Sequence, residues 1–275
     1  MSRLNQRMQA LKTAGRKALV PYLVCGDPCA DATVPAMHAL VSAGADVIEL
    51  GVPFSDPMAE GPVIQRAHER ALAQRMSLRG TLDAVRRFRE TDAETPVVLM
   101  GYANPVEVMG YAAFAQAASA VGVDGLLTVD MPLEEGAELN AALQSAGIAP
   151  IFLIAPTTSA ERLAHICKVA QGYLYYVSLK GVTGAGHLQV DSVAEYLNRI
   201  RALTDKPVCV GFGIKDAASA KAIGALADGV VVGSALVDRL GAIDITKDVE
   251  KAAASISCDV IAPIRQALDA LVTPA

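Results

Sequence analysis

Two acidic residues, Glu49 and Glu60, are spaced so that they could exchange protons with one substrate. Glu49 lies in the apolar segment 47–50, which has the pattern of a buried strand, and an unpaired carboxylate is costly to bury there. The next segment is rich in glycine and proline, so it predicts a shaped loop, and this loop carries Glu60. One carboxylate on a rigid strand and another on a loop suit general acid–base catalysis. From the strand alone, a buried salt bridge would explain Glu49 equally well.

A glycine-rich segment, 181–186, carries a second set of candidates. If this segment acts as a lid, the hydroxyl of Thr183 could orient a carboxylate; the other interpretation is an ordinary glycine-rich connection. Lys180 directly precedes the segment and could form a Schiff base with a carbonyl substrate. Its position beyond a strand and beside flexible glycines favours a solvated lysine instead.

Eight short apolar segments, each followed by a helical pattern, form the scaffold that must position these residues. The strands are predicted over 18–24, 47–50, 96–101, 124–129, 150–154, 173–178, 207–210 and 229–232. Strands that alternate with helices pair in parallel through right-handed crossovers. Eight such units predict an α/β fold, a single (β/α)8 TIM barrel over residues 1–275, with an extra N-terminal helix over 1–14.

A doubly wound sheet is the competing architecture. It needs fewer strands and usually carries a phosphate fingerprint in its first turn, where this chain has Cys25-Gly-Asp-Pro. One continuous helix is predicted over 106–121. In a barrel, the site lies at the carboxyl ends of the strands, which is where Glu49 and its loop fall.

Small residues follow the seventh and eighth predicted strands, at 211–213 and at Gly233 and Ser234. In barrels, phosphate commonly binds between these two loops, because small residues let backbone N–H groups approach the anion. Either glycine pair alone would indicate a tight turn, but together they favour a phosphate site. Three tyrosines within or just after strands could line an aromatic pocket or simply belong to the core: Tyr22, Tyr102 and Tyr175.

Composition argues against several other classes of protein. The net charge of −5 and the lack of a basic run with aromatics argue against nucleic-acid binding. The four histidines, at 38, 68, 165 and 187, show no metal-ligand spacing, so no metal site is expected. The five cysteines show no CxxC spacing, which fits reduced thiols. With no apolar stretch of membrane-spanning length, we expect a cytoplasmic protein with no membrane partner.

Four motifs closely resemble the α subunit family of tryptophan synthase. They are Glu-Leu-Gly-Val-Pro-Phe-Ser-Asp-Pro at 49–57, Gly-Pro-Val-Ile-Gln at 61–65, Gly-Val-Thr-Gly at 181–184 and Gly-Phe-Gly-Ile at 211–214. The resemblance runs nearly end to end. It implies a lyase of tryptophan biosynthesis that cleaves indole-3-glycerol phosphate to indole and glyceraldehyde 3-phosphate. It also implies a β subunit partner in an α2β2 assembly; the β subunit would hold pyridoxal phosphate, and this chain no cofactor.

The resemblance also implies roles for individual residues. Glu49 matches the strand carboxylate that shuttles protons at the indole C3 and the glycerol hydroxyl. Position 60 matches the loop carboxylate that takes the indole N–H proton or stabilises the indolenine cation. The implied substrate contacts are Tyr22, Tyr175, Thr183 and Phe212, and the implied phosphate contacts are Gly184, Gly213, Gly233 and Ser234.

The second carboxylate departs from the family pattern. The family reads Ala-Asp-Gly-Pro where residues 59–62 read Ala-Glu-Gly-Pro. Glutamate keeps the charge but is one methylene longer, and a misplacement of about 1 Å can cost on the order of a hundredfold in rate. Tyr22 likewise stands where the family usually has phenylalanine. The alternative hypothesis is therefore a catalytically weakened α-type subunit that mainly activates its β partner.

Overall fold

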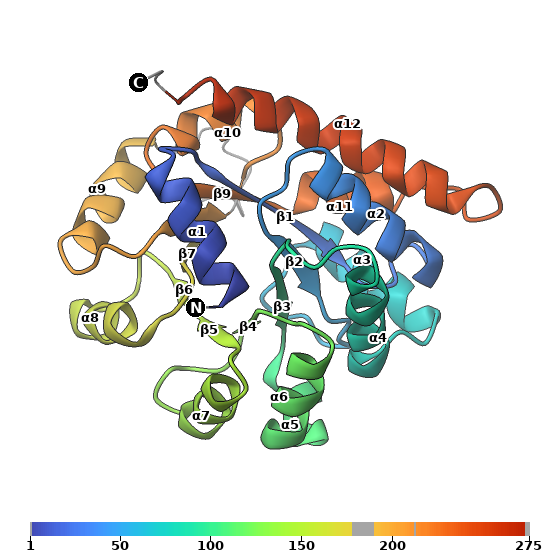
Figure 1. Cartoon of the computed structure of the whole chain (residues 1–275), viewed down its shortest axis with the longest axis horizontal. Coiled ribbons are helices and arrows are strands. Elements are labelled where there is room, and N and C mark those ends of the chain that lie inside the picture. The colour runs from blue at the N-terminus through green and yellow to red at the C-terminus, as the bar shows by residue number, and fades with distance from the viewer. Residues whose placement is uncertain (1, 178–189, 212, 273–275) are drawn as a thin grey trace.

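The computed structural model describes residues 2–177, 190–211 and 213–272, and in these ranges nine parallel strands form one sheet that curves into a nearly closed barrel (Figure 1). The order across the sheet is β5-β4-β3-β2-β1-β9-β8-β7-β6. The strands are β1 (Ala18–Val24), β2 (Ile48–Gly51), β3 (Val97–Gly101), β4 (Gly125–Thr128), β5 (Ala149–Ile151), β6 (Leu153–Ile154), β7 (Leu174–Val177), β8 (Val208–Gly211) and β9 (Gly229–Val232). The predicted (β/α)8 barrel is confirmed.

Nine strands replace the eight predicted because one predicted strand, 150–154, is divided at Phe152. Its first half, β5, pairs with β4, and its second half, β6, pairs with β7. The carbonyl of Phe152 still accepts the N–H of Tyr175, at 3.2 Å. The divided strand therefore joins the two ends of the sheet.

The helices lie around the outside of the barrel (Figure 1). They are α1 (Arg3–Thr13), α2 (Ala30–Ser42), α3 (Pro62–Ala73), α4 (Leu78–Arg89), α5 (Ala103–Met109), α6 (Tyr111–Ala120), α7 (Ala137–Ser145), α8 (Ala160–Val169), α9 (Val190–Arg201), α10 (Ala217–Gly224), α11 (Ser234–Leu240) and α12 (Val249–Asp269). The prediction of one helix over 106–121 is wrong. Gly110 has φ +87°, in the left-handed region that glycine tolerates, and it separates α5 from α6.

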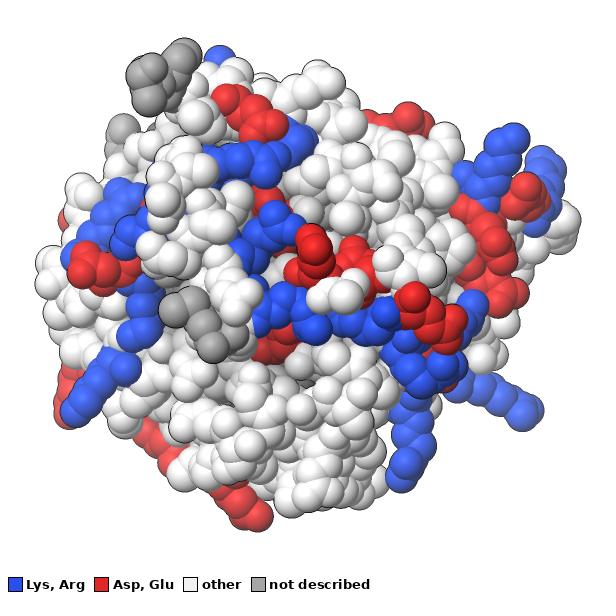
Figure 2. Space-filling model, in the orientation of Figure 1, with Lys and Arg blue, Asp and Glu red and all other residues white. Residues whose placement is uncertain are grey.

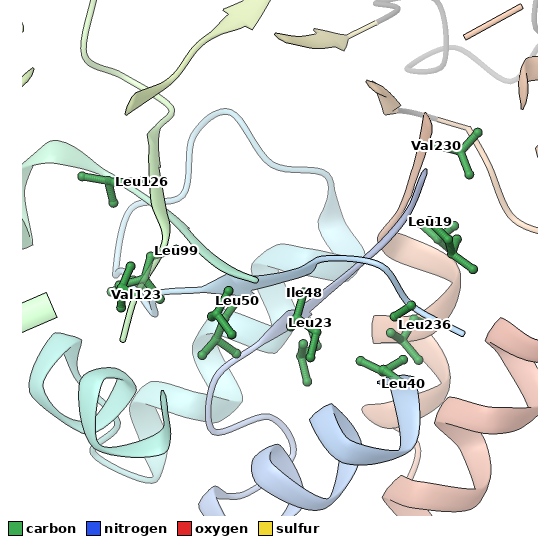
Figure 3. Close-up of a cluster of buried hydrophobic side chains, with 14 of the residues drawn as sticks. Leu19, Leu23, Leu40, Ile48, Leu50, Leu99, Val123, Leu126, Val230 and Leu236 are labelled. Carbon is green, nitrogen blue, oxygen red and sulfur yellow. The ribbon is translucent and has the colours of Figure 1, made fainter. Parts of the chain in front are cut away.

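Outward-facing side chains form a continuous apolar layer between the sheet and the helices. Leu23 lies beside Leu50, Leu50 beside Leu99 and Leu99 beside Leu126 in the parallel register, so one row of leucines crosses four strands (Figure 3). Each of these side chains is buried. Burying a leucine contributes roughly 1.5–3 kcal/mol, so this layer holds the helices against the sheet.

Inward-facing side chains fill the barrel, and the candidate catalytic residue Glu49 is one of them. Tyr22 is in register with Glu49, and Glu49 with Val98, along one interior row. Helix α1 places Leu4, Met8 and Leu11 in the same buried cluster as the interior residues. In Figure 1 this helix crosses the middle of the barrel, so it covers one end. The candidate site is therefore expected at the opposite end, where the strands have their carboxyl ends.

Three aspartates, Asp46, Asp124 and Asp228, brace the beginnings of strands. Each carboxylate accepts the N–H of a residue at the start of a neighbouring strand, namely Leu19 at 3.0 Å, Val97 at 2.8 Å and Val208 at 2.9 Å. All three also form ion pairs: Asp46 with Arg16 and Arg265, Asp124 with Arg3 and Arg89, and Asp228 with Arg201. These contacts fix the scaffold at the end opposite the site.

The charged residues alternate on the face that α1 crosses. Figure 2 shows Lys and Arg lying beside Asp and Glu there rather than gathering into a patch of one sign. None of the helices in the described residues combines the length and apolar character that crossing a membrane requires.

Candidate active site

Glu49 lies in β2, inside the barrel, with none of its surface exposed. The hydroxyl of Tyr173 donates to Glu49 Oε1 at 3.1 Å, whereas Oε2 has no hydrogen-bond partner among the described residues. Burial raises the pKa of Glu49 to about 8; the Tyr173 hydrogen bond opposes the rise and the charge of Glu60 adds to it. The carboxyl group can therefore both give and take a proton near neutral pH. No Lys or Arg in the described ranges pairs with Glu49, which leaves the salt-bridge interpretation without a partner there.

Tyr173 is a site residue that the sequence analysis missed. It directly precedes β7, is fully buried and touches one of the two candidate carboxyl groups. The available signal was its spacing, since Tyr173 and Tyr175 are two residues apart and so share one face of a strand. Both belong to the interior cluster.

Glu60 lies at the end of the loop 52–61, between β2 and α3, and is half-buried. Burial raises the pKa of Glu60 to about 7. Its charge also raises the pKa of Glu49 and Tyr22, so its carboxyl group lies close enough to interact with these interior side chains. The Gln65 side chain donates to the Glu60 carbonyl at 2.9 Å. The structure thus brings the two predicted carboxylates into one site.

Tyr22 and Tyr175 flank this site from β1 and β7, and both are buried. A side chain at Gly51 would collide with the hydroxyl of Tyr22, and one at Gly211 would collide with the hydroxyl of Tyr175. Glycine is therefore needed at both strand ends so that the two rings can lie across the interior. Glu49 affects both tyrosines, because its charge adds to burial in raising their pKa values.

Tyr102, also predicted for an aromatic pocket, supports the loop of Glu60 instead. Its oxygen accepts the N–H of Ala59 at 3.0 Å. Its ring stacks on Phe54 with centroids 4.9 Å apart and planes at 23°. Tyr102 is buried directly after β3, the neighbour of β2 in the sheet.

The predicted phosphate residues lie after β8 and β9. Gly213 is exposed and has φ +76°, a conformation that favours glycine. Gly233 caps α11 without a side-chain bond, and Ser234, the first residue of that helix, is exposed. The first N–H groups of a helix lack intrahelical partners and can bind an anion. Tyr22 lies next to Gly233, because a Cβ on that glycine would be 3.6 Å from the Tyr22 ring.

Three predicted contacts lie outside the described residues: Thr183, Gly184 and Phe212. The same holds for Lys180, the Schiff-base candidate. In the described ranges, no group of three or more His, Cys, Asp or Glu side chains is arranged to hold a metal ion.

Comparison with known proteins gives one consistent result. Residues 8–263 match the model of the family described as tryptophan synthase alpha chain. The chain is 60% identical to the tryptophan synthase alpha chain of Thioalkalivibrio sulfidiphilus (strain HL-EbGR7), over 98% of this chain and 100% of that one. It is 58% identical to the protein of the same name from Laribacter hongkongensis (strain HLHK9), with the same coverage.

Solved structures agree with these relatives. Tryptophan synthase subunit alpha from Legionella pneumophila str. Paris superposes with a TM-score of 0.89 at 47% identity, over 98% of this chain and 99% of that one. A structure of tryptophan synthase from M. tuberculosis, in an open form with BRD0059 bound, gives a TM-score of 0.83 at 37% identity, over 96% and 99%.

Proposed function

Since the chain belongs to the tryptophan synthase alpha chain family, we propose that it cleaves indole-3-glycerol phosphate to indole and glyceraldehyde 3-phosphate. The observation that carries this proposal is Glu49, a buried carboxyl group with one oxygen unpartnered among the described residues and with a pKa that the charge of a second carboxyl group, Glu60, helps to raise. The proposed cleavage uses both groups, because Glu49 moves protons at the ring carbon and at the glycerol hydroxyl while Glu60 balances the charge on the ring nitrogen.

Glu49 carries the two proton transfers in this mechanism. It gives its proton to C3 of the indole, which turns the ring into an indolenine, and then removes the proton of the glycerol hydroxyl next to the bond that breaks. As the hydroxyl becomes an aldehyde, the electrons of the carbon–carbon bond return to the ring and release indole. A pKa of about 8 lets Glu49 serve as donor first and acceptor second.

Glu60 balances the charge on the ring nitrogen. Its carboxylate either takes the indole N–H proton and returns it as indole is released, or stabilises the indolenine cation. Its pKa of about 7 keeps a large charged fraction at neutral pH. Tyr22 and Tyr175 flank the indole, with Thr183 and Phe212 as further substrate contacts. The phosphate is held by Gly184, Gly213, Gly233 and Ser234.

The partner in this proposal is a tryptophan synthase β subunit, in a cytoplasmic α2β2 assembly in which the β subunit holds pyridoxal phosphate. Two large apolar side chains support a docking surface at the open end of the barrel. Met58, in the loop 52–61, is 86% exposed, and Val108, in α5, is 81% exposed. They follow neighbouring strands, β2 and β3. We further propose that residues 1–275 form one domain, since α12, near the end of the chain, packs against α2, near its beginning, on the outside of the barrel (Figure 1).

Indole release by the purified chain tests the proposed reaction. Incubation with indole-3-glycerol phosphate should produce indole and glyceraldehyde 3-phosphate in equal amounts. Borohydride added during turnover should trap no adduct, because the mechanism forms no imine. An adduct on Lys180 would replace this mechanism with a Schiff-base aldolase, and no indole at all would contradict the proposed function.

A further inference from the structure

We propose that His68 and Tyr102 are positioning residues for Glu60, which together hold the loop 52–61 in place. The inference rests on the proposed function, in which Glu60 acts on the substrate. Neither residue is placed against the substrate. Each instead acts through the backbone of the loop.

His68 holds the beginning of the loop. It lies in α3 with 2% of its surface exposed, and its Nδ1 accepts the N–H of Phe54 at 3.0 Å. Burial lowers the pKa of His68 to about 4, so the ring is neutral at pH 7. Because Nδ1 accepts, the ring proton resides on Nε2, and Nε2 has no partner among the described residues. A buried donor without a partner lowers the stability of the fold. The favourable polar contact of His68 is therefore its hydrogen bond to the backbone of the loop.

Tyr102 holds the end of the loop. Its oxygen accepts the N–H of Ala59, the residue directly before Glu60, and its ring stacks on Phe54. The two positioning residues therefore converge on Phe54, with His68 holding the backbone and Tyr102 the ring. Between these points the loop projects into solvent, since Ser55, Asp56 and Met58 are exposed.

The position of Ala59 decides where the Glu60 side chain begins. A displacement of about 1 Å at a reacting group can cost on the order of a hundredfold in rate. Glutamate has one more rotatable bond than aspartate, so its carboxyl group depends more on a fixed backbone. The contacts of His68 and Tyr102 thus fix the backbone from which the longer Glu60 side chain extends.

Substitutions at His68 separate this role from general stability. His68→Leu removes the acceptor for the Phe54 N–H, and we expect kcat to fall at least tenfold with a smaller change in KM. His68→Asn places an amide oxygen near the position of Nδ1, so it should restore kcat to within about threefold of the parent. The matched control is His165→Leu in α8, an exposed histidine far along the chain from this loop. All assays are made well below the melting temperature of each variant.

Tyr102→Phe tests the second contact, because it keeps the ring and removes the oxygen. Hydrogen exchange at the Ala59 amide should become faster, and kcat should fall at least fivefold. Unchanged exchange at Ala59, or a kcat within twofold of the parent, would contradict the role of Tyr102.

A double substitution shows whether the loop contacts act through Glu60. In a Glu60→Gln background, His68→Leu should lower kcat by less than twofold further, because the group being positioned is already gone. A full additional tenfold loss, or parental kcat in either Glu60→Gln or His68→Leu alone, would overturn the proposal. Failure of the proposed function looks different, since the parent chain itself would then release no indole.

Discussion

The hydroxyl of Tyr173 donates to Glu49 Oε1 at 3.1 Å inside the barrel, while Glu49 Oε2 is left without a partner in the described part of the chain. One oxygen is therefore held in place and the other is free to meet a substrate. The same hydrogen bond stabilises the charged form of the carboxyl group against the effect of burial. Tyr173 thus orients Glu49, and it opposes the rise in the Glu49 pKa that burial causes.

Tyr173→Phe should raise the pKa of Glu49 above its value of about 8, because the bond that favours the charged form is lost. We expect the Glu49 limb of the pH profile of kcat/KM to move to higher pH by up to about one unit, the equivalent of one hydrogen bond. The measurement is the pH dependence of indole release for both proteins. An unmoved limb would show that this hydrogen bond does not tune Glu49.

Glu49→Gln should also change how stability depends on pH. Burial raises the folded-state pKa of Glu49 from 4.5 to about 8, so folding opposes ionisation of this group. Below pH 4.5 the group is neutral in both the folded and the unfolded state, so it does not change the free energy of unfolding. Between pH 4.5 and about 8 it ionises only in the unfolded state, so the free energy of unfolding falls as the pH rises. The Gln variant should therefore gain up to a few kcal/mol over the parent at pH 9 and little at pH 4.5. Urea unfolding at the two pH values measures the difference, and an equal difference at both would be the contrary result.

Glu60→Asp should lower turnover rather than raise it. The loop backbone is fixed by Tyr102 and Gln65, so shortening the side chain withdraws the carboxyl group from the site. We expect a loss of roughly tenfold to a hundredfold in kcat, the scale of a 1 Å displacement. Equal rates for the parent, Glu60→Asp and Glu60→Ala would mean that this position takes no part in the chemistry.

Gly51→Ala should destabilise the fold and disturb the substrate pocket, because the new methyl group would collide with the hydroxyl of Tyr22. Overpacking of this kind typically costs about 1–3 kcal/mol. Adding Tyr22→Phe removes the closest of these contacts and should recover part of the loss. The control is Gly61→Ala, whose added methyl group meets nothing within 4 Å. The denaturant midpoints of the variants measure these changes in stability. Equal losses of stability in Gly51→Ala and Gly61→Ala would contradict the packing argument.

The barrel and its carboxylate pair could be predicted from sequence because both depend on local patterns. Strand and helix periodicities repeat through the chain, and Glu49 interrupts an apolar strand. Tyr173 was missed because the sequence of one strand does not show which side chain reaches across to another. The hydrogen bond to Glu49 depends on how the barrel closes, and that closure includes the division of a strand at Phe152.

The loop contacts were missed for a related reason. A lone buried histidine has no sequence pattern, and Nδ1 of His68 accepts from a backbone N–H that any residue could supply. Tyr102 was noticed, but its distance along the chain from Phe54 hides the stacking of the two rings. The break at Gly110 was also unforeseen, because the flanking residues continue a helical pattern on both sides.

Turnover of indole-3-glycerol phosphate by the Glu49→Gln variant tests the central claim most directly. Glutamine keeps the size of the side chain and removes the proton acceptor, so indole release should fall at least about a hundredfold. Binding of an unreactive substrate analogue should change much less, which shows that the pocket is intact. If Glu49→Gln releases indole at close to the parental rate, Glu49 does not carry the proton transfers and the proposed mechanism is wrong.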